Sequence, residues 1–292
     1  MDRKKFIKSA LLTGAVGAIA PHILKAETKK NSKSTYDKLM HQVGFNHLPN
    51  KEVKTMNTVI HKANTRGHAN HGWLNSHHTF SFANYHNPDR MNFGVLRVLN
   101  DDRVMAGQGF GTHPHDNMEI ISIPLEGDLE HKDSMGNVAV IKEGDVQVMS
   151  AGTGITHSEY NKNKDKEVKF LQIWVFPKDS NVVPRYDQIS IRDIKKDNEF
   201  YQVLSPNKDD QGVWVNQDAW FHLGDFTKGK SDDYKIKKEG NGVYAFVLEG
   251  DVEIGGHQLN KRDGIGIWDI TSIQIKAREN ARVLLMEVPM SI

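Results

Sequence analysis

The stretch PLEGDLE at residues 124–130 returns as VLEGDVE at residues 247–253. Each copy follows an apolar run and precedes a further Gly-Asp or Asp-Gly pair and a second apolar run. Seven similar residues can recur by accident, but the matching flanks favour duplication of one β unit. The repeat therefore predicts a chain built from two related β domains.

The rest of the body follows the same pattern of short strands and turns. Runs rich in β-branched and aromatic residues are bounded by Gly, Asn or Asp, as is typical of strands, and they cover residues 93–100, 118–127, 138–149, 168–176, 243–250 and 265–270. No long helical periodicity appears after residue 57. We expect an all-β fold of two β-barrels, with a linker in the proline-containing segment 176–188.

Composition excludes several kinds of chemistry. The 292 residues include no cysteine, so disulfides, thiolate ligands and a cysteine nucleophile are ruled out. A formal net charge of +1 argues against a broad nucleic-acid interface. Twelve of the fifteen histidines fall between His41 and His157. This enrichment points weakly to a metal site, which must then use nitrogen and oxygen ligands.

The N-terminus has the pattern of an export signal. Residues 1–26 combine a basic start with a short apolar run of small residues at 10–20, which is too short to span a bilayer. DRKKFIK at residues 2–8 resembles the twin-arginine export motif, except that Lys4 stands where a second arginine is usual. An amphipathic helix is the alternative. We expect export to the periplasm, with a flexible spacer at residues 27–56; without a working signal the protein would be cytoplasmic.

Two histidine-containing pairs share a strand spacing. His113 and His115 flank a proline, and His157 and Glu159 follow 44 residues later in AGTGITHSEY. Residues i and i+2 of a strand face the same side, so each pair can aim two side chains into one barrel. Either pair alone is more typical of ordinary polar strand positions. Together they predict one ion held by three imidazoles and a carboxylate, a set that suits Fe, Ni, Cu, Zn or Mn.

Other features near the pairs have structural interpretations. Pro114 donates no ladder hydrogen bond and predicts an edge strand or a strand end. We expect packing or hydrogen-bonding roles for four histidines in the stretch before the first pair, His71, His77, His78 and His86. We expect His131 to order a hairpin turn.

The second copy lacks the pairs. A shift of 123 residues, which superposes the two LEGD segments, places Ile236 and Lys238 opposite the first pair and Asn280 and Arg282 opposite the second. We therefore expect the second barrel to be structural.

The segment from GFGTHPHDNMEI through AGTGITHSEYN (residues 109–161), with RGHANHGWLNSHHTFSFANY (residues 66–85) before it, closely resembles the pirin family of the cupin superfamily. The resemblance implies a bicupin, with a metal-binding cupin domain at 57–180 and a ligand-free one at 181–292. It carries the metal ligands onto His113, His115, His157 and Glu159. In the common cupin pattern Glu119 would be the glutamate ligand, so it is a candidate neighbour of the ligands here.

The resemblance also implies a function. Some pirin-like proteins are similar to quercetin 2,3-dioxygenases, so we expect one divalent ion, Fe(II) by the family's preference, a flavonol or related enol as substrate, and O₂. Glu159 would be the catalytic base. The alternative is a non-enzymatic, redox- or metal-responsive iron protein that acts through a protein partner. A metal store is a poor third, because one site in 33.0 kDa holds little.

Overall fold

The computed structural model describes residues 56–291. The predicted export signal and, apart from Met56, the predicted spacer lie outside these residues. Strands dominate the described part, and its one short helix is the 3₁₀ turn η1 (Ala63–Thr65). No helix in this part has the length and apolar character needed to cross a membrane.

Two sheets build the half that contains the histidine pairs. Along its seven-stranded sheet the order is β12 (Arg185–Ser190), β9 (Asp145–Ser150), β6 (Glu119–Glu126), β11 (Val168–Val175), β4 (Leu96–Val104), β3 (Leu74–His78) and β2 (Gly67–Asn70). Its four-stranded sheet has the order β5 (Gly109–His115), β10 (Ile155–Asn161), β7 (Asp128–Asp133) and β8 (Val138–Lys142). All these strands pair antiparallel.

The other half repeats this plan. Its seven-stranded sheet has the order β1 (Asn57–His61), β20 (Gly264–Trp268), β17 (Asn241–Glu249), β22 (Ala281–Pro289), β15 (Trp220–Phe226), β13 (Phe200–Ser205) and β14 (Val213–Trp214). Its four-stranded sheet has the order β16 (Ser231–Lys235), β21 (Ser272–Ala277), β18 (Val252–Ile254) and β19 (His257–Leu259). The duplication predicted from the LEGD repeat is thus visible strand by strand, and the all-β bicupin fold is confirmed.

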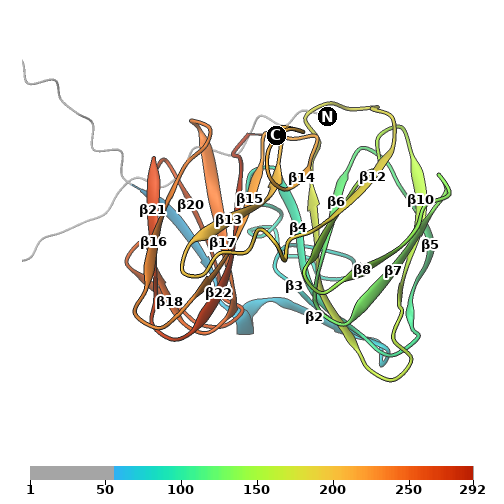
Figure 1. Cartoon of the computed structure of the whole chain (residues 1–292), viewed down its shortest axis with the longest axis horizontal. Helices are drawn as coiled ribbons and strands as arrows, with labels where there is room; N and C mark the ends of the chain where they lie inside the picture. The colour runs from blue at the N-terminus through green and yellow to red at the C-terminus, as the bar shows by residue number, and fades with distance from the viewer. Residues whose placement is uncertain (1–55, 292) are drawn as a thin grey trace, which may run out of the picture. The chain divides into compact units, whose positions relative to one another are not determined.

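The two large sheets face each other across a shared apolar core. Alternate residues of β6, such as Ile121 and Ile123, pack in the same cluster as Phe221 and Leu223 of β15. Figure 1 shows the resulting succession of layers, with the small sheets outermost and the large sheets between them. Because burial of these side chains removes apolar surface from water on both sides, each half stabilises the other.

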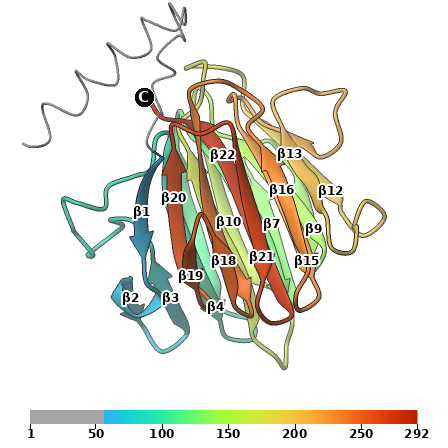
Figure 2. The ribbon, with the colours of Figure 1, turned by 90° about the vertical axis from the view of Figure 1, so that its left-hand side faces the viewer.

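Two strands cross from one half to the other. The first described strand, β1, pairs with β20 along the edge of the second half's large sheet (Figure 2). In return β12, which follows the predicted linker, pairs with β9 of the first half. The halves therefore share backbone ladders as well as a core, and a cut between residues 180 and 181 would leave each large sheet without one of its strands.

The interiors of the two halves differ in what fills them. Sixteen buried apolar side chains form a continuous cluster between the sheets of the second half. The first half has two separate clusters of six and four such residues. None of the predicted ligands belongs to either cluster, and His157 and Glu159 are among the buried polar residues of this half.

The second half has an internal hydrogen-bond network where the first has histidines. Strands β16 and β21 take the places of β5 and β10 in the sheet order. Tyr234 of β16 donates its hydroxyl to buried Glu287 at 2.7 Å, and Asn241 donates its side-chain amide to the same carboxylate at 2.9 Å. This carboxylate also accepts backbone N–H bonds from Lys237 and Lys238, so its lone pairs are satisfied within the protein.

The residue correspondence expected from the LEGD shift needs a correction at the second pair. Asn280 precedes β22 and Arg282 belongs to it, whereas the counterpart of β10 is β21. The inward residues of β21 include the buried Ile273 and Ile275. A constant shift fails because β18 and β19 have three residues each, whereas β7 has six and β8 has five.

Candidate metal centre

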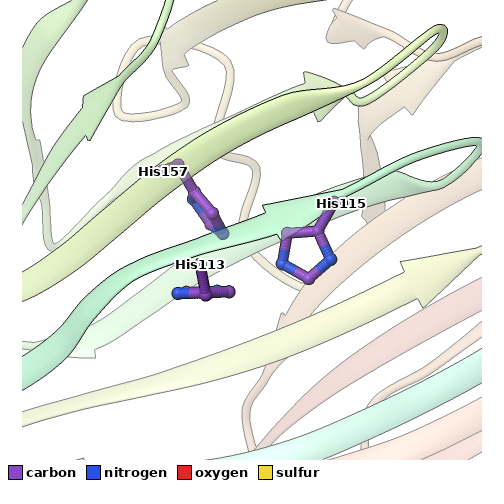
Figure 3. A group of neighbouring side chains, drawn as sticks. All are labelled: His113, His115 and His157. Carbon is purple, nitrogen blue, oxygen red and sulfur yellow. The ribbon is translucent and has the colours of Figure 1, made fainter.

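Three of the four predicted ligands meet at one point. His113 and His115 lie on β5 and His157 lies on the adjacent β10 (Figure 3). A nitrogen from each of the three lies within 4.8 Å of the others, and the described residues contain no other such group. The backbone explains this meeting, because His157 is the cross-strand partner of His113 in the antiparallel ladder.

The local sequence makes this pairing possible. Strand β5 lies at the edge of its sheet, as Pro114 predicted. The outer side of β5 has no neighbouring strand, so the N–H that Pro114 lacks is not needed for a hydrogen bond there. Gly109 lets β5 approach the irregular part of β10 closely, because a Cβ there would lie 2.2 Å from the carbonyl oxygen of Glu159. The i, i+2 spacing then turns both β5 imidazoles to the side of His157.

The protonation states of these histidines suit metal binding. Burial and the neighbouring imidazoles lower the pKa of His115 to about 4 and that of His157 to about 3. Both rings are therefore neutral near pH 7, with a free lone pair for a metal. Nδ1 of His113 donates to the carbonyl oxygen of Gly111 at 2.7 Å, which leaves its Nε2 as the ligand atom.

His157 gives the strongest indication of an ion. Its side chain is 2% exposed, and neither ring nitrogen has a hydrogen-bond partner among the described residues. Buried polar atoms of this kind are nearly always paired in folded proteins. A metal between the three rings would satisfy one of them, so the donor set fits a transition ion such as Fe, Ni, Cu or Zn.

Glu159, the fourth predicted ligand, lies outside this group of nitrogens in the described structure. A register shift in β10 separates it from His157. Its two carboxylate oxygens accept hydrogen bonds from Ser122 at 3.1 Å and from Gln172 at 2.7 Å. The carboxylate and His113 line the same small cavity.

That cavity also includes residues that were not expected from the sequence. Asn100 and Asp102 of β4 line it together with Gln172 and Trp174 of β11. Ser76 donates a hydrogen bond to Asp102, and burial raises the pKa of Asp102 to about 7. The signal available in the sequence was the polar run 100–103, in which Asn100, Asp101 and Asp102 follow the apolar Val98 and Leu99 directly.

Of the other histidines considered, His77, His78 and His131 have the packing and hydrogen-bonding roles expected of them. His77 stacks on His68 with ring centroids 4.6 Å apart, and His78 meets the edge of Phe82. His131 bonds Asp133, which accepts the backbone N–H groups of the hairpin turn after β7. The imidazole of His131 also lies 5.4 Å from that of His157, so it forms one wall of the histidine group.

Glu119 lies between the two halves rather than beside the histidines. It shares a face of β6 with Ile121, which belongs to the shared core. One of its oxygens accepts hydrogen bonds from Ser150 at 2.8 Å and from the backbone of Asn216 at 3.1 Å. The other has no partner among the described residues.

This position predicts a pH-dependent stability. Burial raises the pKa of Glu119 from 4.5 to about 7, so the folded state favours the protonated carboxyl. Its contribution to the free energy of unfolding is lost as the pH rises from about 4.5 through 7. We expect Glu119→Gln to be more stable than the parent at pH 8, by about 1–3 kcal/mol, with little difference at pH 4.5.

Urea unfolding of both proteins at the two pH values measures this difference. The buried neutral histidines give the free energy of unfolding a pH dependence of the opposite sign. They are the same in both proteins, so their contribution cancels in the difference between the variant and the parent. An equal difference between the two proteins at both pH values would contradict the prediction.

Comparisons with known proteins agree with the fold. Residues 59–175 match the family model described as Pirin, and residues 202–288 match the one described as Quercetinase C-terminal cupin domain. A quercetin 2,3-dioxygenase of Escherichia coli K12 is 45% identical over 230 residues, which are 79% of this chain and 98% of the relative. A pirin-like protein of Caulobacter vibrioides is 39% identical, over 76% of this chain and 95% of the relative.

A solved structure of a related protein has the same overall fold. The crystal structure of the bacterial pirin YhhW from Escherichia coli, in complex with nickel(II), superposes with a TM-score of 0.76 and 43% identity. The match covers 81% of this chain and all of that one. With both family models in chain order, a relative 45% identical over nearly its whole length and the histidine group in the first half, the chain belongs to the pirin family.

Proposed function

We propose that the protein is a metal-dependent dioxygenase that cleaves flavonol-type substrates with O₂. The observation that carries this proposal is the group of three histidines, with the buried and unpartnered nitrogens of His157, next to a cavity that a carboxylate lines. The names of the relatives support it, since the Escherichia coli relative is a quercetin 2,3-dioxygenase. The balanced reaction consumes one O₂ per flavonol and releases one carbon monoxide, with both oxygen atoms retained in the ring-opened ester.

His113, His115 and His157 would hold one divalent ion, with Glu159 as a fourth ligand. The ion would supply Lewis-acid and redox chemistry at an open coordination position. Fe(II) is our proposal for its identity, and the nickel(II) complex of the Escherichia coli pirin makes nickel the main competitor. Imidazole and carboxylate donors accept both metals.

Glu159 is also the proposed base. It would take the proton of the substrate's enol hydroxyl onto a carboxylate oxygen. Gln172 donates to this carboxylate at 2.7 Å and Ser122 at 3.1 Å. Both residues therefore hold Glu159 in the cavity, and rotation about its side chain would exchange one of these bonds for a ligand or a substrate.

Export to the periplasm remains part of the proposal. It is supported by the basic and apolar pattern of residues 1–26. A twin-arginine-like route carries folded proteins and would let the chain acquire its metal in the cytoplasm first.

Elemental analysis and oxygen uptake test the function. We expect the purified full-length chain to contain about one transition ion per molecule and to consume O₂ with quercetin, with equal amounts of carbon monoxide released. His113→Ala should lose both properties. A loaded protein that consumes no O₂ with a broad panel of flavonols and related enols would refute the enzyme proposal and favour a regulatory protein that binds a partner.

A further inference from the structure

Glu159, Ser122 and Gln172 form a closed ring of hydrogen bonds inside the first half. Gln172 donates its side-chain amide to one carboxylate oxygen at 2.7 Å, and the hydroxyl oxygen of Ser122 lies 3.1 Å from the other. The same hydroxyl oxygen lies 3.1 Å from the amide oxygen of Gln172. Glu159 is 2% exposed, Ser122 0% and Gln172 8%. The ring is therefore shielded from water, where hydrogen bonds to a charged group are strong.

The two donors of this ring belong to the opposite sheet from the three histidines that meet. Ser122 of β6 and Gln172 of β11 are cross-strand partners in the large sheet, whereas the histidines lie on β5 and β10 of the small sheet. Glu159 also belongs to β10, but its carboxylate is bonded to the large sheet and lies outside the group of histidine nitrogens. The carboxylate must therefore shift toward these nitrogens to bind the same ion, and this shift strains its bonds to Ser122 and Gln172.

Ser122 has one hydroxyl proton and two acceptors at the same distance, so it donates to one of them at a time. Donation to Glu159 holds the carboxylate in its present position. Donation to Gln172 keeps the hydroxyl proton paired after the carboxylate has turned away. Departure of Glu159 therefore leaves no buried hydroxyl without an acceptor, which is the usual requirement in a protein interior.

We propose that Ser122 and Gln172 are positioning residues that compete with the metal ion for the carboxylate of Glu159. In the ion-free protein they supply the hydrogen bonds that a buried carboxylate requires. Binding of an ion draws Glu159 toward the histidines, and Ser122 then turns its proton to Gln172. This role rests on the proposed function, in which Glu159 is a metal ligand, but metal affinity tests it without any substrate.

Gln172→Leu is expected to tighten metal binding. The buried carboxylate loses its shorter hydrogen bond, which raises the free energy of the ion-free protein more than that of the loaded protein, where the ion offsets the charge. We expect the dissociation constant for nickel(II) to fall about tenfold, which corresponds to one hydrogen bond. Competition of the full-length chain with a chelator of known affinity, without O₂, measures it. Loss of a residue that merely supports a ligand has the opposite sign and weakens metal binding.

The same substitution in a Glu159→Gln background shows whether the effect passes through Glu159. Glutamine has no charge that needs the amide of Gln172 or the ion. We therefore expect Gln172→Leu to leave the nickel(II) affinity of the Glu159→Gln protein unchanged. The difference between the two backgrounds is the coupling between Glu159 and Gln172.

Gln217→Leu is the matched control. Gln217 is 7% exposed and donates its side-chain amide to the carbonyl oxygen of Phe176 at 2.9 Å, but it does not line the cavity beside His113. Its substitution removes a similar buried hydrogen bond, so the stability should fall while the nickel(II) affinity equals that of the parent.

Ser122→Ala is the second test variant and decides alone if Gln172→Leu fails to fold. It should also tighten nickel(II) binding, but by less, because the bond from Ser122 is longer than that from Gln172. Its own control is Ser150→Ala, which removes a buried hydroxyl that donates to Glu119 at 2.8 Å. Ser150→Ala should leave the nickel(II) affinity unchanged.

Two results would overturn the proposal. One is weaker or unchanged nickel(II) binding in the folded Gln172→Leu and Ser122→Ala proteins, which would mean that the pair does not compete with the ion. The other is tighter binding that persists in the Glu159→Gln background, since the effect would then bypass the carboxylate. Failure of the dioxygenase proposal looks different, because the nickel(II) affinities would follow the expected pattern while no flavonol causes O₂ uptake.

Discussion

Replacing His157 by alanine is expected to reduce the metal content from about one ion per chain to below a tenth, and to abolish flavonol-dependent O₂ uptake. His157 is the most buried of the three histidines that meet, and it is the cross-strand partner of His113. Its loss leaves two histidine ligands, both on an edge strand, with Glu159, and loss of even a supporting contact costs a metal site about 10–100-fold in affinity. Metal analysis after dialysis against a weak chelator measures the effect.

His222→Ala is the matched control for this substitution. His222 is a buried histidine of β15 in the second half, and burial lowers its pKa to about 3 as it does for His157. Both substitutions remove a buried imidazole, so both should lower thermal stability. Retention of metal by His222→Ala and its loss from His157→Ala would assign the metal to the histidine group. Full metal content in a folded His157→Ala protein would contradict the prediction.

Replacing Glu159 by glutamine is expected to lower flavonol turnover by about 10²–10⁴-fold, while much of the metal remains. The three imidazoles still provide nitrogen ligands, and glutamine preserves the size of the side chain in the cavity. The substitution removes the carboxylate that would accept the proton of the substrate's enol hydroxyl. Turnover measured with the metal content of each preparation separates loss of the base from loss of the ion.

Glu119→Gln makes the same chemical change at a second buried carboxylate of this half. Glu119 faces the shared core and contacts Ser150 and Asn216, so turnover per bound ion should stay at the level of the parent. Substantial turnover in Glu159→Gln would show that another group is the base. Equal losses in both variants would contradict a specific role of Glu159, because Glu119 does not line the cavity.

Pattern and spacing predicted which two strands carry the candidate ligands. The pairs at 113/115 and 157/159 are local, and a strand turns alternate residues to one side wherever it lies. Pro114 likewise predicted an edge strand, because a missing donor has the same consequence in any sheet. Glu159 shows the limit of this reasoning: the irregular register of β10 and the hydrogen bonds from Ser122 and Gln172 decide where its carboxylate lies.

The cavity could not be predicted in this way. Asn100 lies on β4 and Trp174 on β11, and these strands reach the histidines by pairing across long stretches of sequence. A polar residue between apolar residues of a strand predicts a polar partner in the interior. The order of the strands decides which residue that partner is. The sequence also did not predict that β1 pairs in the second half and β12 in the first. Both are short runs, and their partner strands are distant in sequence.

The sequence by itself determined that the chain is an all-β duplication with two histidine-bearing strands in its first copy. Repeats, turn residues and a period of two are properties of neighbouring positions, and they survive in any tertiary context. Only the tertiary structure decided that three imidazoles meet while the carboxylate lies in an adjoining cavity, and that the second copy is filled by sixteen apolar side chains. The physical reason is that metal geometry and cavity volume depend on strand order, register and packing between distant residues, and these are fixed when the sheets close on each other.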